Sequence, residues 1–190
     1  MTNISRKTKE TDIELSLELH GSGKSKIDTK IGFFNHMLEA LSKHAFLDLE
    51  LSCKGDINVD FHHSVEDAGI VIGQALNKEI FPVKNMERFG EAVILLDEAA
   101  VSCVIDLSGR AFFFCDLPLE NKVGEFDAEL AEEFFRALVI NAGLSAHLTF
   151  IRGKNRHHII EAAFKAFAVA LRRAVSENKR AQIPSTKGVL

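Results

Sequence analysis

Histidine and glutamate residues recur in this sequence in an arrangement that can bind metal ions. Two copies of an H-H-x-x-E motif are present: His62, His63 and Glu66 form the first, and His157, His158 and Glu161 form the second. On a helix with about 3.6 residues per turn, His62 and Glu66 share a face, whereas His63 is rotated by about 100° from His62. One motif can therefore offer ligands to two neighbouring ions, and two motifs related by a pseudo-twofold axis can surround a pair of ions.

The ligand types in these motifs favour a metal held by nitrogen and oxygen atoms. Imidazole together with carboxylate suits manganese, iron or zinc. Cys53, Cys103 and Cys115 lack C-x-x-C spacing, which disfavours a structural zinc site and a disulfide framework. The alternative is that each motif is only a polar helix start, whose glutamate stabilises the first turn through the helix dipole. Two copies at matching places favour the metal site.

The second half of the chain repeats the first. The stretch H-H-S-V-E-D-A-G-I-V-I-G-Q-A-L from His62 is similar to H-H-I-I-E-A-A-F-K-A-F-A-V-A-L from His157, 95 residues further along. The same offset carries a helix near Phe34 onto one near Glu129, and strand-rich stretches precede each histidine pair. We therefore predict an α+β fold of two tandem half-domains, about 1–90 and 91–190, each a mixed β-sheet packed against helices, fused into a single domain.

Hydrophobic periodicity locates the individual elements. Alternating apolar residues predict strands over 13–19, 47–53 and 57–61, the last two paired across the Gly55-Asp56 turn signal. Helices are expected from about residue 35, from residue 62 until Pro82, and from about 158 to 175. The first histidine pair would then lie at the junction of a strand and a helix.

Composition narrows the class of protein. The 190 residues are 46% hydrophobic, enough for a substantial core, and 23 basic against 27 acidic residues give a net charge of −4. This balance argues against electrostatic binding to nucleic acid or to an acidic membrane. The polar N-terminus lacks an apolar signal segment, and no run of about 18 apolar residues occurs. We expect a cytoplasmic protein with no nucleic-acid or membrane partner.

Three longer sequence blocks carry a family resemblance. They are D-F-H-H-S-V-E-D from Asp60, G-K-N-R-H-H-I-I-E-A from Gly153 and P-S-T-K-G from Pro184. With shorter matches beginning at Lys9-Glu10-Thr11, they closely resemble the signature blocks of imidazoleglycerol-phosphate dehydratases, in order and over essentially the whole chain. Ser64 stands where threonine is commoner, and Ala111 where proline is expected. Neither departure removes a chemical group from the expected site.

The resemblance implies a fold, a reaction and a cofactor. The fold would be ribosomal protein S5 domain 2-like, and the reaction would be a hydro-lyase step of histidine biosynthesis, in which imidazoleglycerol phosphate loses water to give imidazoleacetol phosphate. Two Mn²⁺ ions per active site would be bound by His36, His62, His63, Glu66, His147, His157, His158 and Glu161. The i,i+4 geometry suggests that His62 and Glu66 share one ion, and that His157 and Glu161 share the other.

Two of these eight ligands fall outside the repeat. The 95-residue offset places His147 opposite Ser52 and His36 opposite Ala131, so neither has an equivalent histidine. Their assignment therefore depends on the resemblance. His20 and His44 receive no role and are expected to be structural.

The resemblance also implies an acid/base group, a phosphate site and an assembly. Glu10 would be the catalytic general acid/base. The substrate phosphate would be bound by Arg88, Arg110, Lys165, Ser185 and Lys187. The segment 184–188 would be a loop that orders over the phosphate. The family forms a homo-oligomer of 24 subunits with active sites at the subunit interfaces.

Two other functions are compatible with the histidine motifs alone. A di-metal hydrolase uses similar ligands to activate a bridging hydroxide, and a non-enzymatic metal-binding protein would need no substrate. An assay of water loss against phosphate release separates the dehydratase from the hydrolase. Metal binding without turnover would identify the third class.

Overall fold

The structure is a computed structural model that describes residues 1–180 and 182–188. The first half comprises β1 (Thr2–Lys7), β2 (Thr11–Glu18), β3 (Ser25–Asp28), α1 (Gly32–Ala45), β4 (Asp48–Gly55) and α2 (His62–Ile80). The second half comprises β5 (Phe89–Leu96), β6 (Ala99–Asp106), β7 (Phe112–Cys115), β8 (Lys122–Val123), β9 (Phe126–Asp127), α3 (Leu130–Ala142), β10 (Ser145–Arg152) and α4 (Arg156–Ala174). Apart from the short β8–β9 hairpin, the two halves have the same order of elements.

Each half contains a four-stranded sheet with the same topology. The strand orders are β1-β2-β4-β3 and β5-β6-β10-β7. In both sheets neighbours among the first three strands of this order run antiparallel to one another. The short last strand, β3 or β7, pairs in parallel with β4 or β10. Buried and exposed residues alternate along β2 and β4, so one sheet face covers the core. The predicted α+β class with mixed sheets is confirmed.

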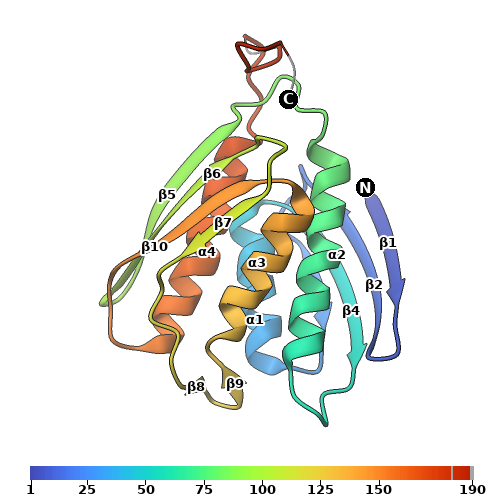
Figure 1. Cartoon of the computed structure of the whole chain (residues 1–190), viewed down its shortest axis with the longest axis vertical. Coiled ribbons are helices and arrows are strands. Elements are labelled where there is room, and N and C mark those ends of the chain that lie inside the picture. The colour runs from blue at the N-terminus through green and yellow to red at the C-terminus, as the bar shows by residue number, and fades with distance from the viewer. Residues whose placement is uncertain (181, 189–190) are drawn as a thin grey trace.

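The four helices lie between the two sheets (Figure 1). Helix α1 packs against α4, and α2 packs against α3, so both helix pairs join the first half to the second. Their contacts are rich in buried phenylalanine, with Phe134 against Phe34 and Phe164 among the ring pairs. The two halves therefore share one hydrophobic core. None of the helices in the described ranges is long and apolar enough to span a membrane.

Two strand predictions differ from the structure. Residues 57–61 were expected to pair with β4, but they form a turn into α2, in which the Val59 N–H donates to Asp56 O at 2.8 Å. The reason is that β2 and β3 already occupy both edges of β4. The structure also adds two unpredicted edge strands in the first half, β1 and β3, each with one large apolar residue, Ile4 or Ile27, which gives little periodic signal.

The spacing between the halves is not constant along the chain. The offset is 95 residues at the histidine motifs, but β2 and β6 begin 88 residues apart and β4 and β10 begin 97 apart, because the β8–β9 hairpin lengthens the second half. When β4 and β10 are aligned by their first residues, His147 corresponds to Glu50. When α1 and α3 are aligned in the same way, His36 corresponds to Phe134. The predicted partner positions were therefore wrong, although neither histidine has a histidine equivalent.

Candidate active site

The first cluster of ligand-type side chains forms where α1 meets α4. The Nε2 atom of His157 lies 3.1 Å from Oε2 of Glu161, one turn further along α4. The Nε2 atom of His36, on α1, lies 3.4 Å from the same oxygen. In the described residues this is the only group of three or more such side chains whose ligand atoms all lie within 4.8 Å of one another. Two histidines and a glutamate are thus arranged to hold one ion.

Glu161 is held in its charged form despite its burial. Its side chain is only 12% exposed, and Lys165 Nζ lies 2.5 Å from its Oε1. Burial acts to raise the pKa of this carboxyl, but the ion pair with Lys165 and the contact with His157 outweigh it, so the pKa lies below its ordinary value. Glu161 therefore has one carboxylate oxygen on Lys165 and the other near His36 and His157.

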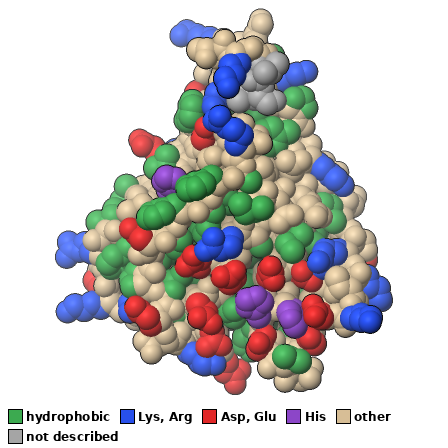
Figure 2. All heavy atoms as spheres, viewed as in Figure 1, with side chains coloured by type: hydrophobic (Ala, Val, Ile, Leu, Met, Phe, Trp, Pro, Cys, Tyr) green, Lys and Arg blue, Asp and Glu red, His purple; other side chains and the backbone are tan. Residues whose placement is uncertain are grey.

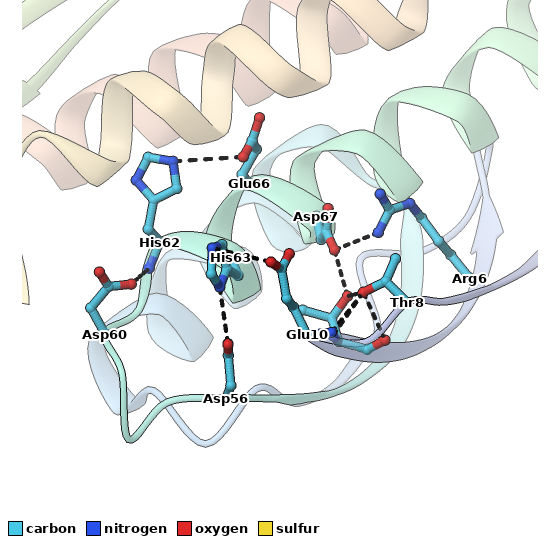
Figure 3. Close-up of polar contacts among 10 residues, drawn as sticks. Arg6, Thr8, Glu10, Asp56, Asp60, His62, His63, Glu66 and Asp67 are labelled. Carbon is cyan, nitrogen blue, oxygen red and sulfur yellow. Dashed lines mark hydrogen bonds and ion pairs between the residues drawn. The ribbon is translucent and has the colours of Figure 1, made fainter.

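The first motif, with His62, His63 and Glu66, lies at the start of α2 (Figure 3). The Nε2 atom of His62 lies 3.6 Å from Oε2 of Glu66, as expected for residues four apart on one helix face. Both side chains are about half exposed. Both α2 and α4 begin at the lower end of the view in Figure 1, and Figure 2 shows histidine side chains surrounded by acidic ones in that region.

His63 points away from His62 and contacts two carboxylates (Figure 3). Its Nδ1 atom lies 3.2 and 3.1 Å from the two oxygens of Asp56, the residue that follows β4. Its Nε2 atom lies 3.8 Å from Oε1 of Glu10. The hydrogen bond with Asp56 raises the pKa of His63. The candidate acid/base Glu10 therefore lies beside a candidate metal ligand.

His158 has a similar environment in the second half. Its Nδ1 atom lies 2.7 Å from Oε2 of Glu98, in the turn between β5 and β6, and its Nε2 atom lies 3.9 Å from Oδ2 of Asp97. The bond to His158 and two backbone N–H donors, those of Asn155 and Lys154, lower the pKa of Glu98 to about 2. The same contact raises the pKa of His158.

Side chains that precede each motif fix where its helix begins. Asn155 is the N-cap of α4, and its Oδ1 accepts the N–H of His157 at 2.9 Å and that of His158 at 3.4 Å. In the first half Asp60 accepts the N–H of His62 at 2.8 Å. These bonds satisfy amides that have no partner within the helix. They place each histidine pair on the first turn.

The turn that carries Glu10 is tied to α2 (Figure 3). Thr8 Oγ1 accepts the N–H groups of Glu10 and Thr11, at 3.1 and 3.0 Å. The hydroxyl of Thr11 and the guanidinium of Arg6 both donate to Asp67, which is nearly buried on α2. Because Asp67 follows Glu66 on the same helix, this network links the position of Glu10 to that of the first motif.

His147 lies apart from both clusters. It is exposed on β10, on the sheet face that points away from the helices, with its ring 5.7 and 5.5 Å from those of Phe112 and Phe114. Figure 2 shows a histidine beside exposed hydrophobic side chains on this side of the molecule. Within the described residues, the single chain does not bring His147 into a group with the other expected ligands.

The expected phosphate-binding residues do not converge in one place. Arg88 makes an ion pair with Asp106, in which Nε lies 2.7 Å from Oδ1, and its Nη1 donates to Pro184 O at 2.7 Å. It thereby holds the segment that carries Ser185 and Lys187, in which the Lys187 N–H donates to Ser185 Oγ at 3.2 Å. Arg110 is exposed beyond the end of β6. Lys165 is committed to Glu161 in the first cluster.

The two histidines without a predicted role lie outside these clusters. His20 follows β2 in a turn, close to Glu18. His44 is in the last turn of α1, where burial lowers its pKa. Its carbonyl oxygen accepts a 3.1 Å hydrogen bond from Arg172 Nη1, which ties α1 to α4.

Three carboxylates at the site were not predicted from the sequence. Asp56 and Glu98 contact the second histidine of each motif, and Asp67 holds the Glu10 turn. Glu98 stands directly before β6 as Glu10 stands directly before β2. A comparison of the strand starts of the two halves would have identified it, but no local motif marks it.

The fold and the site together define the class of protein: an α+β protein of two similar halves with a candidate site for a divalent metal ion. Its two halves have the same topology, and each places a histidine pair on the first turn of its last helix and a glutamate one turn further along, with further carboxylates nearby. Such a donor set suits a divalent metal ion, since imidazole nitrogens and carboxylate oxygens are its ordinary protein ligands.

Comparisons with known proteins identify the family. Residues 29–171 match the sequence profile of the family described as "Imidazoleglycerol-phosphate dehydratase". Relatives with that name are 63% identical over 97% of both chains in Campylobacter hominis and 62% identical over the full length of both chains in Nitratiruptor sp.. The chain belongs to the imidazoleglycerol-phosphate dehydratase family.

Solved structures agree with this assignment. A crystal structure of imidazoleglycerol-phosphate dehydratase from Staphylococcus aureus matches with a TM-score of 0.82 and 42% identity, over 93% of this chain and 100% of that one. The enzyme from Pyrococcus furiosus matches with a TM-score of 0.85 and 36% identity, over 98% and 100%. The resemblance and the fold predicted from the sequence are confirmed, and a hydrolase or a non-enzymatic metal-binding protein is not favoured.

Proposed function

We propose that this chain is a hydro-lyase of histidine biosynthesis that removes water from imidazoleglycerol phosphate to give imidazoleacetol phosphate. The observation that carries the proposal is the family match across residues 29–171. The chain retains the groups that such a reaction needs: metal ligands, an acid/base carboxylate and cationic side chains. Because a phosphorylated substrate is charged and crosses membranes poorly, we place the reaction in the cytoplasm.

We propose that two Mn²⁺ ions bind in each active site. The donor set fits them, because His36, His157 and Glu161 already place their ligand atoms within 4.8 Å of one another. His62 and Glu66 offer a similar pair on α2. Ions held by these residues would supply Lewis-acid stabilisation of the charge that develops on the substrate as its hydroxyl group leaves.

Glu10 is the proposed general acid/base. Its carboxylate is 54% exposed and lies 3.8 Å from Nε2 of His63, so it borders the proposed metal site and can still reach a substrate. After the hydroxyl leaves, a carboxylate at this position would remove a proton from the neighbouring carbon to give an enol, which tautomerises to the ketone. The turn built by Thr8 and Thr11 holds it there.

The substrate phosphate is proposed to bind Arg88, Arg110, Lys165, Ser185 and Lys187. Lys165 supports a link between the two ends of the substrate, because it is one helical turn beyond Glu161 and bonded to it. Arg88 supports a link to the C-terminal segment, because it donates to Pro184 O. Guanidinium groups and hydroxyls at fixed positions are suited to phosphate oxygens.

We propose that the active site is completed by other copies of the chain, in a homo-oligomer of 24 subunits. The first support is that the expected ligands are distributed over separate regions of one chain, with His147 on the outer face of the second sheet. The second support is the apolar character of that face. It exposes Phe89, Val93, Leu95, Val104, Phe112 and Phe114. An exposed apolar surface of this kind marks an interaction site.

The first sheet provides an internal comparison. A row of cross-strand partners on its outer face is Asn3, Ser16, Glu50 and Lys26, and the equivalent row on the second sheet is Glu91, Val104, His147 and Phe114. The same topological row is thus entirely polar in the first half, whereas in the second half two of its four residues, Val104 and Phe114, are apolar. The second sheet is the face that a neighbouring subunit would cover.

An assay with imidazoleglycerol phosphate tests the proposed function. We expect formation of a ketone product, no release of inorganic phosphate, and loss of activity on chelation that added Mn²⁺ restores. Phosphate release would instead identify a hydrolase, and metal binding without turnover would identify a non-enzymatic protein. Light scattering with and without chelator tests the assembly: a mass that does not depend on metal would argue against metal ligands shared between subunits.

A further inference from the structure

The second histidine of each motif has its Nδ1 atom on a carboxylate. His63 Nδ1 lies 3.1 Å from Oδ2 of Asp56, and His158 Nδ1 lies 2.7 Å from Oε2 of Glu98. A carboxylate at neutral pH only accepts hydrogen bonds, so Nδ1 must carry the proton in both rings. The neutral ring then has its lone pair on Nε2, the nitrogen that faces away from the carboxylate.

We propose that Asp56 and Glu98 are positioning residues for metal binding, which hold His63 and His158 in the tautomer and orientation that present Nε2 to an ion. The inference rests on the proposed function, because it assumes that these histidines are metal ligands. A carboxylate that accepts the other ring N–H fixes the orientation of a ligating histidine and makes it a better donor.

The two carboxylates reach the histidines from different parts of the fold. Asp56 follows β4, whereas Glu98 lies in the turn between β5 and β6. The residue equivalent to Glu98 in the first half is Glu10, and Glu10 lies on the Nε2 side of His63 rather than on its Nδ1 side. Because non-equivalent residues make the same contact in the two halves, duplication of one ancestral contact does not explain it. What the two halves have in common is the contact of a carboxylate with Nδ1 of the second histidine.

Glu98 is held by backbone amides as well as by His158. Its Oε1 accepts the N–H of Lys154 at 3.1 Å and that of Asn155 at 2.8 Å, which leaves Oε2 directed at His158. The loop that starts α4, the carboxylate and the imidazole ring are thus joined in one network. Such support keeps a metal ligand in place on a helix end that is otherwise exposed to solvent.

Glutamine at position 98 tests this arrangement without removing the backbone contacts. The amide oxygen of Glu98→Gln can take the place of Oε1 and accept the two N–H groups. The amide nitrogen then faces Nδ1 of His158 and donates to it, so the ring proton moves to Nε2 and blocks the proposed ligand atom. We expect the affinity for Mn²⁺ to fall about 10- to 100-fold, with little change in the thermal stability of the metal-free chain.

Position 56 gives a different pattern, because Nδ1 of His63 lies at similar distances from both oxygens of Asp56. Asparagine can turn its oxygen toward the ring, so Asp56→Asn should weaken Mn²⁺ binding only slightly. Asp56→Ala removes the acceptor and should weaken binding as much as Glu98→Gln does. If only the lost charge mattered, Asp56→Ala and Asp56→Asn would weaken Mn²⁺ binding equally. A larger loss in Asp56→Ala therefore reports the lost hydrogen-bond acceptor.

The experiment is equilibrium dialysis of the full-length variants against MnCl₂, with free Mn²⁺ measured by electron paramagnetic resonance. The control alters a nearby carboxylate that does not contact Nδ1: Glu120→Gln breaks the 2.8 Å ion pair with Arg156 at the start of α4. This control should bind Mn²⁺ like the wild type.

The outcomes separate this inference from the proposed function. Unchanged Mn²⁺ affinity in Glu98→Gln, with a large loss in His158→Ala, would overturn the positioning role and leave the metal ligands in place. A wild-type chain that binds no Mn²⁺ would contradict the proposed metal site itself. If Asp56→Ala does not fold, Glu98→Gln and Asp56→Asn still decide the matter, because both are isosteric with the native side chains.

Discussion

Glu10 and Glu98 occupy the same position in the two halves, directly before β2 and β6, yet they face opposite nitrogens of their histidines. Glu98 bonds to Nδ1 of His158 and to two backbone amides, which hold its pKa at about 2. Glu10 makes no such bonds within the described residues and lies 3.8 Å from Nε2 of His63. A carboxylate with a pKa of about 2 is a poor acid/base near neutral pH. The duplicated position thus holds one carboxylate fixed by hydrogen bonds, Glu98, and one without them in the described residues, Glu10, which is the proposed acid/base.

The first prediction concerns Glu10. Glu10→Gln keeps the size and polarity of the side chain but cannot take up a proton. We expect turnover to fall about 10²- to 10⁴-fold, while Mn²⁺ binding stays at the wild-type level, as measured by steady-state kinetics and dialysis on the same preparation. Near-normal turnover would reject the proposed role of Glu10.

The second prediction concerns which ligands share an ion. His157 and Glu161 lie 3.1 Å apart and His62 and Glu66 lie 3.6 Å apart, each pair on one helix face. If each pair holds a different ion, a double alanine variant of either pair should lower the metal content from two ions to one per site. Elemental analysis after gel filtration measures this ratio. Retention of both ions in either variant would contradict the proposed division.

The sequence predicted the parts of the site that depend on local pattern. The H-H-x-x-E spacing locates both helix starts, and the i,i+4 contact of His157 with Glu161 follows from helix geometry. His36 joins this pair through the packing of α1 against α4, and no feature of the sequence near residue 36 encodes that packing. The contact between Glu98 and His158 spans 60 positions, and only a comparison of the strand starts of the two halves points to Glu98.

Unpredicted strands such as β1, and the strand wrongly predicted over residues 57–61, have a common physical reason. Apolar alternation reports burial, and β1 is an edge strand with few buried residues, so its signal is weak. Residues 57–61 alternate but leave Val59 exposed, because both edges of β4 are already paired. Whether an alternating segment joins a sheet depends on a free edge, which only the topology provides.

The third prediction concerns the contact of α2 with α3, which joins the two halves. A Cβ on Gly73 would lie 2.4 Å from Leu138 O, so Gly73→Ala must push the helices apart. We expect a loss of about 1–3 kcal/mol in the free energy of unfolding. The control is Gly32→Ala at the start of α1, where the added Cβ meets nothing within 4 Å. That change should be neutral or stabilising by up to about 1 kcal/mol.

Denaturant titrations at equal protein concentration measure both glycine variants, since self-association would otherwise shift the apparent stability. Equal stability of Gly73→Ala and wild type would show that the helices can separate without loss. That result would mean that the halves are less tightly packed than their close approach at Gly73 indicates.

The fourth prediction is a pH dependence that arises outside the two histidine motifs. Asp48 Oδ1 accepts the backbone N–H groups of Lys24 and Ser22, both at 2.8 Å, and these bonds lower its pKa below the ordinary 3.8. A depressed pKa means that the folded state favours the ionised form. Its contribution to stability is therefore full above pH 3.8 and is lost as the pH falls through the lower pKa of the folded state.

The variant Asp48→Asn keeps an acceptor oxygen but has no charge, so its stability does not change with this titration. We expect wild type to melt at a higher temperature than Asp48→Asn above pH 5, and the difference to shrink as the pH is lowered below 3.8. Thermal melts monitored by circular dichroism at several pH values measure the difference. A constant difference across this range would show that the charge of Asp48 does not stabilise the fold.

The last prediction concerns the outer face of the second sheet. Phe114 is the cross-strand partner of His147 there, and Lys26 is the partner of Glu50 at the equivalent place on the first sheet. A glutamate buried at a subunit contact would be left without a partner, which is costly. Phe114→Glu should therefore lower the mass of the metal-loaded protein in light scattering, whereas Lys26→Glu, on the polar sheet, should leave it unchanged. An unchanged mass in both variants would mean that the apolar face is not the subunit contact, and that His147 does not reach a neighbouring active site through it.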